Sequence, residues 1–164
     1  MSTRGKKTGS AFGKLDHIAI AVRSIAQARK FYEDVLGAKF MYEHDNQQAG
    51  FRYAEFDLDG TVIEILEPLH EDSFLHRFLD RYGEGFHHMT FNVPDARARA
   101  ADLKSRGVRI IDEKEHSPAS FEAFISPRST HGLLIQMGSG FPTLSLDPEW
   151  ERVVPSFKFR RDDK

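Results

Sequence analysis

The sequence predicts an α+β fold made of two repeated βαβββ modules. Short runs rich in branched and aromatic residues predict the strands, and apolar residues at helical spacing predict one long helix in each half. Three landmarks of different residue type recur after nearly the same interval: 71 residues from His17 to His88, 70 from Gly37 to Gly107, and 72 from Glu64 to Gln136. This agreement predicts that the second half repeats the first.

The first module begins with a strand and a helix. Residues 15–22 read LDHIAIAV, a branched run that is typical of a strand. Ser24 and Gln27 have the spacing of a capping box, which predicts that a helix begins after Ser24. Gly37 suits the left-handed residue that ends many helices. Between them, apolar side chains recur at helical spacing: Ile25, Ala28, Phe31, Tyr32, Val35 and Leu36.

Three strands complete the first module, at residues 39–43, 51–58 and 61–66. The last two are separated only by Asp59-Gly60, a strong signal for a two-residue hairpin turn. This turn predicts that the two strands pair directly with each other.

The second module repeats this order. Residues 86–93 read FHHMTFNV and predict a strand, after which Pro94-Asp95 opens an alanine-rich helix that ends at Gly107. Three more strands follow at residues 108–112, 121–126 and 133–137. In the connector between the modules, Asp72 or Ser73 can cap a short helix.

These patterns divide the chain into three parts. Residues 1–13 are expected to be a flexible leader, because they hold basic residues, three glycines and small polar residues with little to bury. Residues 14–137 form the predicted domain, with modules at 14–68 and 86–137 and the connector helix within 69–85. Residues 138–164 form a C-terminal arm that has no counterpart in the modules and contains the only tryptophan, Trp150.

Composition excludes several classes of protein. The chain has 164 residues, a formal net charge of −2 and no cysteine. The missing cysteines exclude disulfides, thiolate metal sites and a catalytic cysteine, and the near-neutral charge argues against a nucleic-acid partner. No apolar run approaches the roughly 18 residues needed to span a membrane, so we expect no membrane partner. A cytoplasmic location is the simplest interpretation.

Four polar residues at repeat-related positions predict a metal site. His17 and His88 occupy matching places in the first strands of the two modules, and Glu64 and Gln136 occupy matching places in the last strands. Glu64 and Gln136 each lie between two apolar residues, so their side chains point to the opposite face of the strand. A carboxylate within such an apolar strand is costly unless it is paired or bound to metal. Two imidazoles, a carboxylate and an amide oxygen suit Zn, Ni, Co, Mn or Fe(II).

In these features the sequence resembles the vicinal oxygen chelate superfamily, which includes glyoxalases, bleomycin-resistance proteins and dioxygenases. The stretches that carry the resemblance are LDHIAIAV, AQARKFYEDVLGAKF, IEILEP and GEGFHHMTFNV. Within the superfamily the chain is most similar to methylmalonyl-CoA epimerases, through TVIEILEPLHEDSFLHRFLDRYGEGFHHMTFNV, DLKSRGVRIIDE and SPRSTHGLLIQ. The resemblance implies a curved mixed sheet around one divalent metal ion, and many relatives are dimers, so we expect a homodimer.

The resemblance also implies roles for individual residues. His17, Glu64 and His88 match family metal ligands, and Gln136 stands where many epimerases and glyoxalases carry a glutamate ligand. In the loop between the second and third strands, Gln47 stands where epimerases carry a glutamate base, and Glu43 and Asp45 are the nearby acids. A glutamine is not a useful proton acceptor. Glu64 is therefore the catalytic candidate that this interpretation leaves.

The favoured function is a metal-dependent isomerase. It would use enolate chemistry on a 2-substituted malonyl-CoA or a related acyl thioester, in the manner of an epimerase. Two alternatives stay open: a glyoxalase-I-like lyase acting on a hemithioacetal, and a non-catalytic small-molecule-binding protein of the bleomycin-resistance type. Extradiol dioxygenase chemistry is disfavoured, because those relatives usually take their glutamate from the last strand of the second module, where this chain has Gln136.

Overall fold

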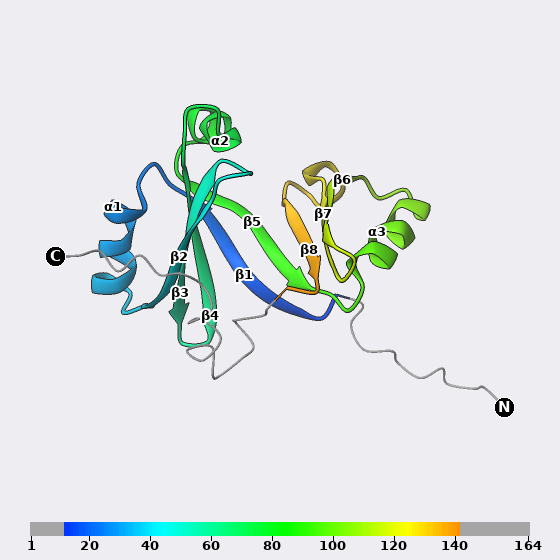
Figure 1. The fold of residues 1–164 in the computed structure, drawn as a ribbon, viewed down its shortest axis with the longest axis horizontal. Coiled ribbons are helices and arrows are strands. Elements are labelled where there is room, and N and C mark those ends of the chain that lie inside the picture. Colours follow the sequence, from blue (N-terminus) through cyan, green and yellow to red (C-terminus); the bar gives the residue numbers. More distant parts are fainter. Residues whose placement is uncertain (1–11, 142–164) are drawn as a thin grey trace. The chain divides into compact units, whose positions relative to one another are not determined.

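The structure is a computed structural model that describes residues 12–141. It confirms the α+β class for that part of the chain, which has eight strands and three α-helices and in which the order β-α-β-β-β occurs twice (Figure 1). The predicted leader, except for its last two residues, and the arm beyond residue 141 with Trp150 lie outside the described residues. No helix within residues 12–141 is long and apolar enough to cross a lipid bilayer.

The described residues divide into two compact units, each with its own strands and helices. The first unit comprises residues 16–89, and the second comprises residues 12–15 and 90–141. The boundary falls within two strands, after Leu15 in β1 (Lys14–Ala21) and after Met89 in β5 (Gly85–Asn92).

The first unit has the strand order β2-β3-β4-β1-β5. Its antiparallel part is β2 (Lys39–Asn46), β3 (Phe51–Leu58) and β4 (Thr61–Pro68), and β1 runs parallel to β4. The predicted turn at Asp59-Gly60 is present, with positive φ at both residues, 51° and 84°. Because this turn has only two residues, it fixes the register of β3 on β4, beginning with the pair Leu58 and Thr61.

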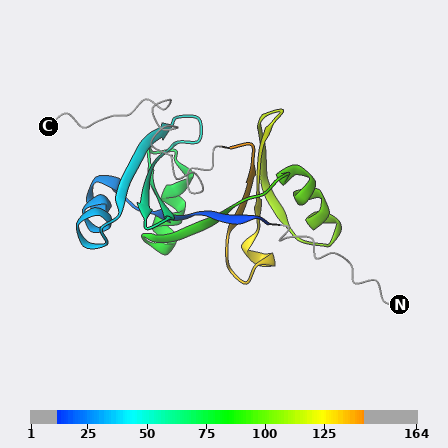
Figure 2. The same cartoon turned by 90° about the horizontal axis from the view of Figure 1, so that it is seen from below.

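Two helices cover opposite faces of this sheet (Figures 1 and 2). On one face, Ile25 of α1 (Ile25–Lys30) packs with Ala54, Phe56 and Ile65. On the other face, Leu75 and Leu79 of α2 (Phe74–Tyr82) pack with Ala19, Ala21 and Leu66. Since neighbouring strand residues point to opposite faces, Glu64 lies on the face that α2 partly covers.

The first predicted helix begins as expected but ends differently. Ser24 caps it, because its hydroxyl accepts a hydrogen bond from the Gln27 N–H at 3.3 Å. The α-helix continues only to Lys30, and residues Phe31–Val35 form a wider π-helical turn, η1. There the Leu36 N–H donates to the carbonyl of Phe31, five residues back, at 3.1 Å. Apolar spacing does not distinguish this turn from an α-helical one.

The second unit has the strand order β5-β8-β7-β6. It contains α3 (Ala96–Ser105), β6 (Ile110–Ser117), β7 (Ser120–Ile125), a short 3₁₀ turn η2 (Pro127–Ser129) and β8 (Ile135–Ser139). The predicted apolar side of α3, formed by Ala96, Ala100 and Leu103, packs on one face of the sheet. That face presents Phe121, Ala123, Ile125 and Met137.

Candidate metal centre

Three of the four predicted metal ligands lie together in the first unit. His17 is on β1, Glu64 on β4 and His88 on β5, and one ligand atom from each lies within 4.8 Å of the other two. The parallel register places Ala19 opposite Glu64, so His17 and Glu64 are diagonal neighbours on one face of the sheet. His17 Nε2 is 3.7 Å from Glu64 Oε1, and the rings of the two histidines have their centroids 5.8 Å apart.

The centre is buried and surrounded by acidic groups. Asp16 accepts a hydrogen bond from His17 Nδ1 at 2.8 Å. Burial disfavours the charged imidazole, but the carboxylates of Glu64 and Asp16 outweigh this effect and raise the pKa of His17 to about 9. The His17 imidazole therefore favours a bound proton, and a divalent cation that binds there would displace that proton.

His87 supports His88 rather than facing solvent. The Nδ1 atoms of the two rings are 2.8 Å apart, so one of them carries the proton of this hydrogen bond. The ring of His87 packs against Phe74 and Phe78 of α2, with centroid distances of 6.0 and 4.8 Å. Burial lowers the pKa of His87 to about 4, which keeps its ring neutral at ordinary pH.

The donor set fits a borderline divalent metal ion. Two imidazoles and one carboxylate converge within the distance that a single ion can bridge. The second nitrogen of each histidine is held by a neighbouring side chain, Asp16 for His17 and His87 for His88. Metal-binding histidines in proteins are usually oriented by such hydrogen bonds. The residues therefore suit the metals expected from the sequence.

A second buried carboxylate, which the sequence analysis missed, lies on the same face. Glu55 of β3 is 7 % exposed and stands directly opposite Glu64 in the register of β3 and β4. The hydroxyl of Tyr42 donates to Glu55 Oε1 at 2.7 Å. Burial and the neighbouring Glu64 carboxylate raise the pKa of Glu55 to about 7. The Asp59-Gly60 turn was the signal that could have revealed it, because a two-residue hairpin pairs residue 55 with residue 64.

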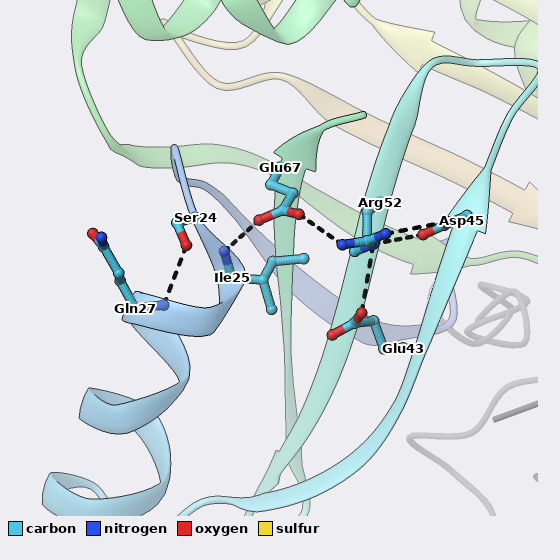
Figure 3. A network of polar contacts seen from close by, with 7 residues as sticks. All are labelled: Ser24, Ile25, Gln27, Glu43, Asp45, Arg52 and Glu67. Carbon is cyan, nitrogen blue, oxygen red and sulfur yellow. Dashed lines mark hydrogen bonds and ion pairs between the residues drawn. The ribbon is translucent and has the colours of Figure 1, made fainter. Parts of the chain in front are cut away.

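The other acids considered near the site point away from it. Glu43 and Asp45 pair with Ala54 and Arg52 in the sheet register, so they lie on the face that carries α1. Arg52 holds both, with Nε 2.5 Å from Asp45 Oδ1 and 3.5 Å from Glu43 Oε1 (Figure 3). Gln47 is exposed in the turn between β2 and β3. Neither Glu43 nor Asp45 therefore replaces the base expected in that loop.

Gln136, the fourth predicted ligand, belongs to the second unit. It lies on β8, where its amide nitrogen donates to Glu122 Oε2 at 2.8 Å and its amide oxygen accepts from the Thr90 hydroxyl at 2.7 Å. Its participation in the centre stays a prediction.

Comparison with known proteins identifies the family. The model of the Glyoxalase/Bleomycin resistance protein/Dioxygenase superfamily matches residues 14–137, and the chain belongs to this superfamily. The protein YqjC of Bacillus subtilis, whose function is uncharacterized, is 38% identical over 126 residues, which cover 76% of this chain and 90% of YqjC.

Two solved structures connect the chain to one activity within the superfamily. Methylmalonyl-CoA epimerase from Mycobacterium tuberculosis is 31% identical with a TM-score of 0.73, over 89% of this chain and 100% of that one. A variant of the Streptomyces coelicolor methylmalonyl-CoA epimerase, in complex with 2-nitronate-propionyl-CoA, is also 31% identical, with a TM-score of 0.69 over 80% of this chain and 97% of that one. The chain is thus related to isomerases that act on acyl-CoA thioesters.

Proposed function

We propose that this protein is a metal-dependent isomerase that epimerises a 2-substituted malonyl-CoA or a related acyl thioester. The observation that carries the proposal is the cluster of His17, Glu64 and His88 on one face of the sheet, in a chain similar to methylmalonyl-CoA epimerases. His17, Glu64 and His88 are the residues that would hold one divalent ion (Co, Ni, Zn, Mn or Fe). Bound there, the ion supplies Lewis-acid stabilisation of the charge that develops on a thioester oxygen.

The protein's own side chains move the proton. Epimerisation removes the proton from the carbon next to the thioester carbonyl and returns a proton to the opposite face, so substrate and product have the same composition. We assign the acceptor role to a carboxylate oxygen of Glu64, which is the catalytic candidate. Glu55 provides a second carboxylate on the same face of the sheet, held by Tyr42, where Gln47 and Gln136 offer none. The burial of Glu64 and His88 limits access of water to the reacting groups.

The test is proton exchange at the α-carbon. Metal-loaded protein is incubated with one diastereomer of methylmalonyl-CoA in deuterated water, and incorporation of deuterium and the change of configuration are followed by NMR. We expect exchange with the wild-type protein and none with a His17→Ala/His88→Ala variant that remains folded by circular dichroism. Absence of exchange in the metal-loaded wild type would overturn the epimerase assignment. Turnover of methylglyoxal plus a thiol would instead identify a glyoxalase-type lyase, and tight ligand binding without reaction would identify a binding protein.

A further inference from the structure

Glu55 is a buried carboxylate of the first unit that lies in direct register with two polar side chains. It stands on β3, opposite Glu64 on β4 and opposite Tyr42 on β2. Residues in register point to the same face of an antiparallel sheet, so all three side chains lie on the face of the candidate metal centre. Burying a carboxylate lowers stability unless its surroundings compensate, and exceptions of this kind concentrate at functional sites.

Tyr42 holds Glu55 in one position. Its hydroxyl donates to Glu55 Oε1 at 2.7 Å, and its ring is buried in a cluster with Met41 and Val62. The ring of Tyr53, which precedes Glu55 on the same face of β3, packs edge-on against the Tyr42 ring at a centroid distance of 5.8 Å. A hydroxyl has one proton to donate, so Tyr42 occupies one carboxyl oxygen and Oε2 is the oxygen that can hold and release a proton.

The carboxyl groups of Glu55 and Glu64 are held from opposite sides. The strand order is β2-β3-β4-β1, and Glu55 is bonded to Tyr42 of β2, whereas Glu64 Oε1 lies 3.7 Å from His17 Nε2 of β1. The Cβ atoms of residues in direct register lie about 4.5–5.5 Å apart, and here each carboxyl group is drawn toward a different neighbouring strand. A carbon atom placed between the two groups would therefore present one face to Glu64 and the other to Glu55.

The other acids of this sheet are engaged elsewhere. Those of β2 lie on the face that carries α1, where Arg52 binds them. Asp57, two residues beyond Glu55 on β3, accepts a hydrogen bond from the Gly60 N–H in the hairpin turn at 2.8 Å. Among the residues that the structure describes, Glu55 and Glu64 are the two buried acids, and they stand side by side.

We propose that Glu55 is the second acid–base group of this site and returns a proton to the α-carbon on the face opposite the one that Glu64 deprotonates. This inference rests on the proposed function, which assigns removal of the proton to Glu64. In one direction the C–H bond breaks, its proton passes to a Glu64 oxygen and its electron pair moves toward the thioester carbonyl. The pair then forms a new C–H bond on the other face with the proton of the Glu55 carboxyl group, which is left ionised. In the reverse direction Glu55 accepts and Glu64 donates, so substrate and product have the same composition.

The test follows the two diastereomers of methylmalonyl-CoA separately in deuterated water with metal-loaded protein. NMR records deuterium incorporation and change of configuration for each. Glu55→Gln keeps the size of the side chain and an oxygen for Tyr42 to donate to, but it neither accepts nor returns a proton. Because Glu64 remains, the diastereomer whose α-proton faces Glu64 should still exchange, with retention of configuration. Exchange of the other diastereomer, and interconversion of the two, should fall about 10²- to 10⁴-fold.

Two further variants sharpen this test. Tyr42→Phe keeps the buried ring and removes the bond to Glu55, so we expect a loss in the same diastereomer of about 10-fold, the effect of one hydrogen bond. Glu43→Gln is the matched control, because Glu43 belongs to the same hairpin but lies on the other face, and it should behave as the wild type. Competition with a chelator for Co²⁺ identifies the variants that bind metal as the wild type does.

Each outcome decides a separate point. Interconversion at the wild-type rate in Glu55→Gln would overturn the inference. So would an equal loss of exchange in both diastereomers by a variant that binds Co²⁺ normally, since Glu55 would then act on the site as a whole and not on one face of the substrate. Failure of the proposed function is distinguishable, because the wild type itself would then exchange neither diastereomer.

Discussion

Glu55 and Glu64 stand directly opposite each other on neighbouring antiparallel strands, and both are buried. Two carboxylates in direct register repel each other when both are ionised. Here Tyr42 donates a hydrogen bond to one of them and His17 lies 3.7 Å from the other. This pair therefore concentrates negative charge at the candidate metal centre. Two ionised carboxylates here would lower the stability of the fold unless a proton or a cation balances their charge.

The stability of the metal-free protein should decrease as the pH rises. Folding raises the pKa of Glu55 from 4.5 to about 7, so the native state binds more protons than the unfolded state between these values, and stability is lost across them. His17, raised from 6.5 to about 9, stabilises the native state fully below 6.5 and loses this contribution as the pH rises through 9. We expect the free energy of unfolding in urea, measured with a chelator, to fall from pH 5 to pH 7.5.

Glu55→Gln separates the two contributions. The amide keeps the size of the side chain and an oxygen for Tyr42 to donate to, but it does not ionise. We expect the decrease between pH 5 and pH 7.5 to become shallower in this variant and the decrease above pH 7.5 to remain. An unchanged profile over the whole range would contradict the raised pKa of Glu55. Glu115→Gln, at a half-exposed surface position, serves as the control and should leave the profile unchanged.

Asp16 should tune the affinity of the metal centre without being a ligand. Its carboxylate accepts from the Nδ1 atom of His17 and thereby directs the Nε2 atom toward Glu64. Removing such a support typically lowers metal affinity about 10- to 100-fold. We therefore expect Asp16→Ala to bind Co²⁺ and Zn²⁺ more weakly by a factor in this range, measured by chelator competition. Asp80→Ala, which removes an exposed partner of Arg23, should bind as the wild type does; equal affinities for all three proteins would exclude this role.

Much of the first unit's site could be predicted because it depends on local patterns. The branched run around His17 and the alternation around Glu64 fix which face each side chain occupies, and the repeat relates them to His88. The position of Glu55 opposite Glu64 could also have been predicted, since the Asp59-Gly60 turn determines which residues of the two strands pair. The π-helical turn after Lys30 could not be predicted, because the spacing of Phe31, Tyr32 and Val35 fits either helix geometry.

Glu122 could not be inferred from the sequence for a different reason. The pairing of β6 with β7 contains two irregularities in register, so counting residues from the turn does not give the partner of Glu122 on β6. The link from Glu122 to Gln136 depends on side-chain rotamers across a strand pair whose connection includes a 3₁₀ turn. Such contacts arise from packing of the whole unit and leave no periodic signal.

Phe56 should be a principal source of stability in the first unit. Its side chain is completely buried on the face under α1, where Tyr32 and Phe40 contact its ring at centroid distances of 5.8 and 5.6 Å. Replacing a buried phenylalanine by alanine typically costs about 3–5 kcal/mol, because the lost contacts leave a cavity. We expect Phe56→Ala to lower the free energy of unfolding by that amount and Phe56→Leu by less. A loss below about 1 kcal/mol for Phe56→Ala would show that the core collapses around the site.

Glu67 should stabilise the start of α1 as well as the sheet. One carboxylate oxygen accepts from the backbone N–H of Ile25 at 2.6 Å, and the other lies 3.2 Å from Arg52 Nη1 (Figure 3). The first N–H groups of a helix have no partner within it, and this carboxylate accepts a hydrogen bond from one of them. Its negative charge also interacts favourably with the positive end of the helix dipole. Arg52 keeps its contacts with Asp45 and Glu43 when Glu67 is removed (Figure 3).

Two substitutions at this position separate the cap from the ion pair. Glu67→Gln keeps an oxygen that can accept from Ile25 but loses the charge that faces Arg52, while Glu67→Ala loses both. Hydrogen bonds to charged groups contribute about 1.5–3 kcal/mol, so we expect Glu67→Ala to lower the free energy of unfolding in urea by that amount and Glu67→Gln by clearly less. Glu115→Ala removes an exposed ion pair with Arg97 and should cost no more than about 1 kcal/mol. Equal losses for the two Glu67 variants would mean that the ion pair with Arg52, and not the bond to the helix start, carries the stabilisation.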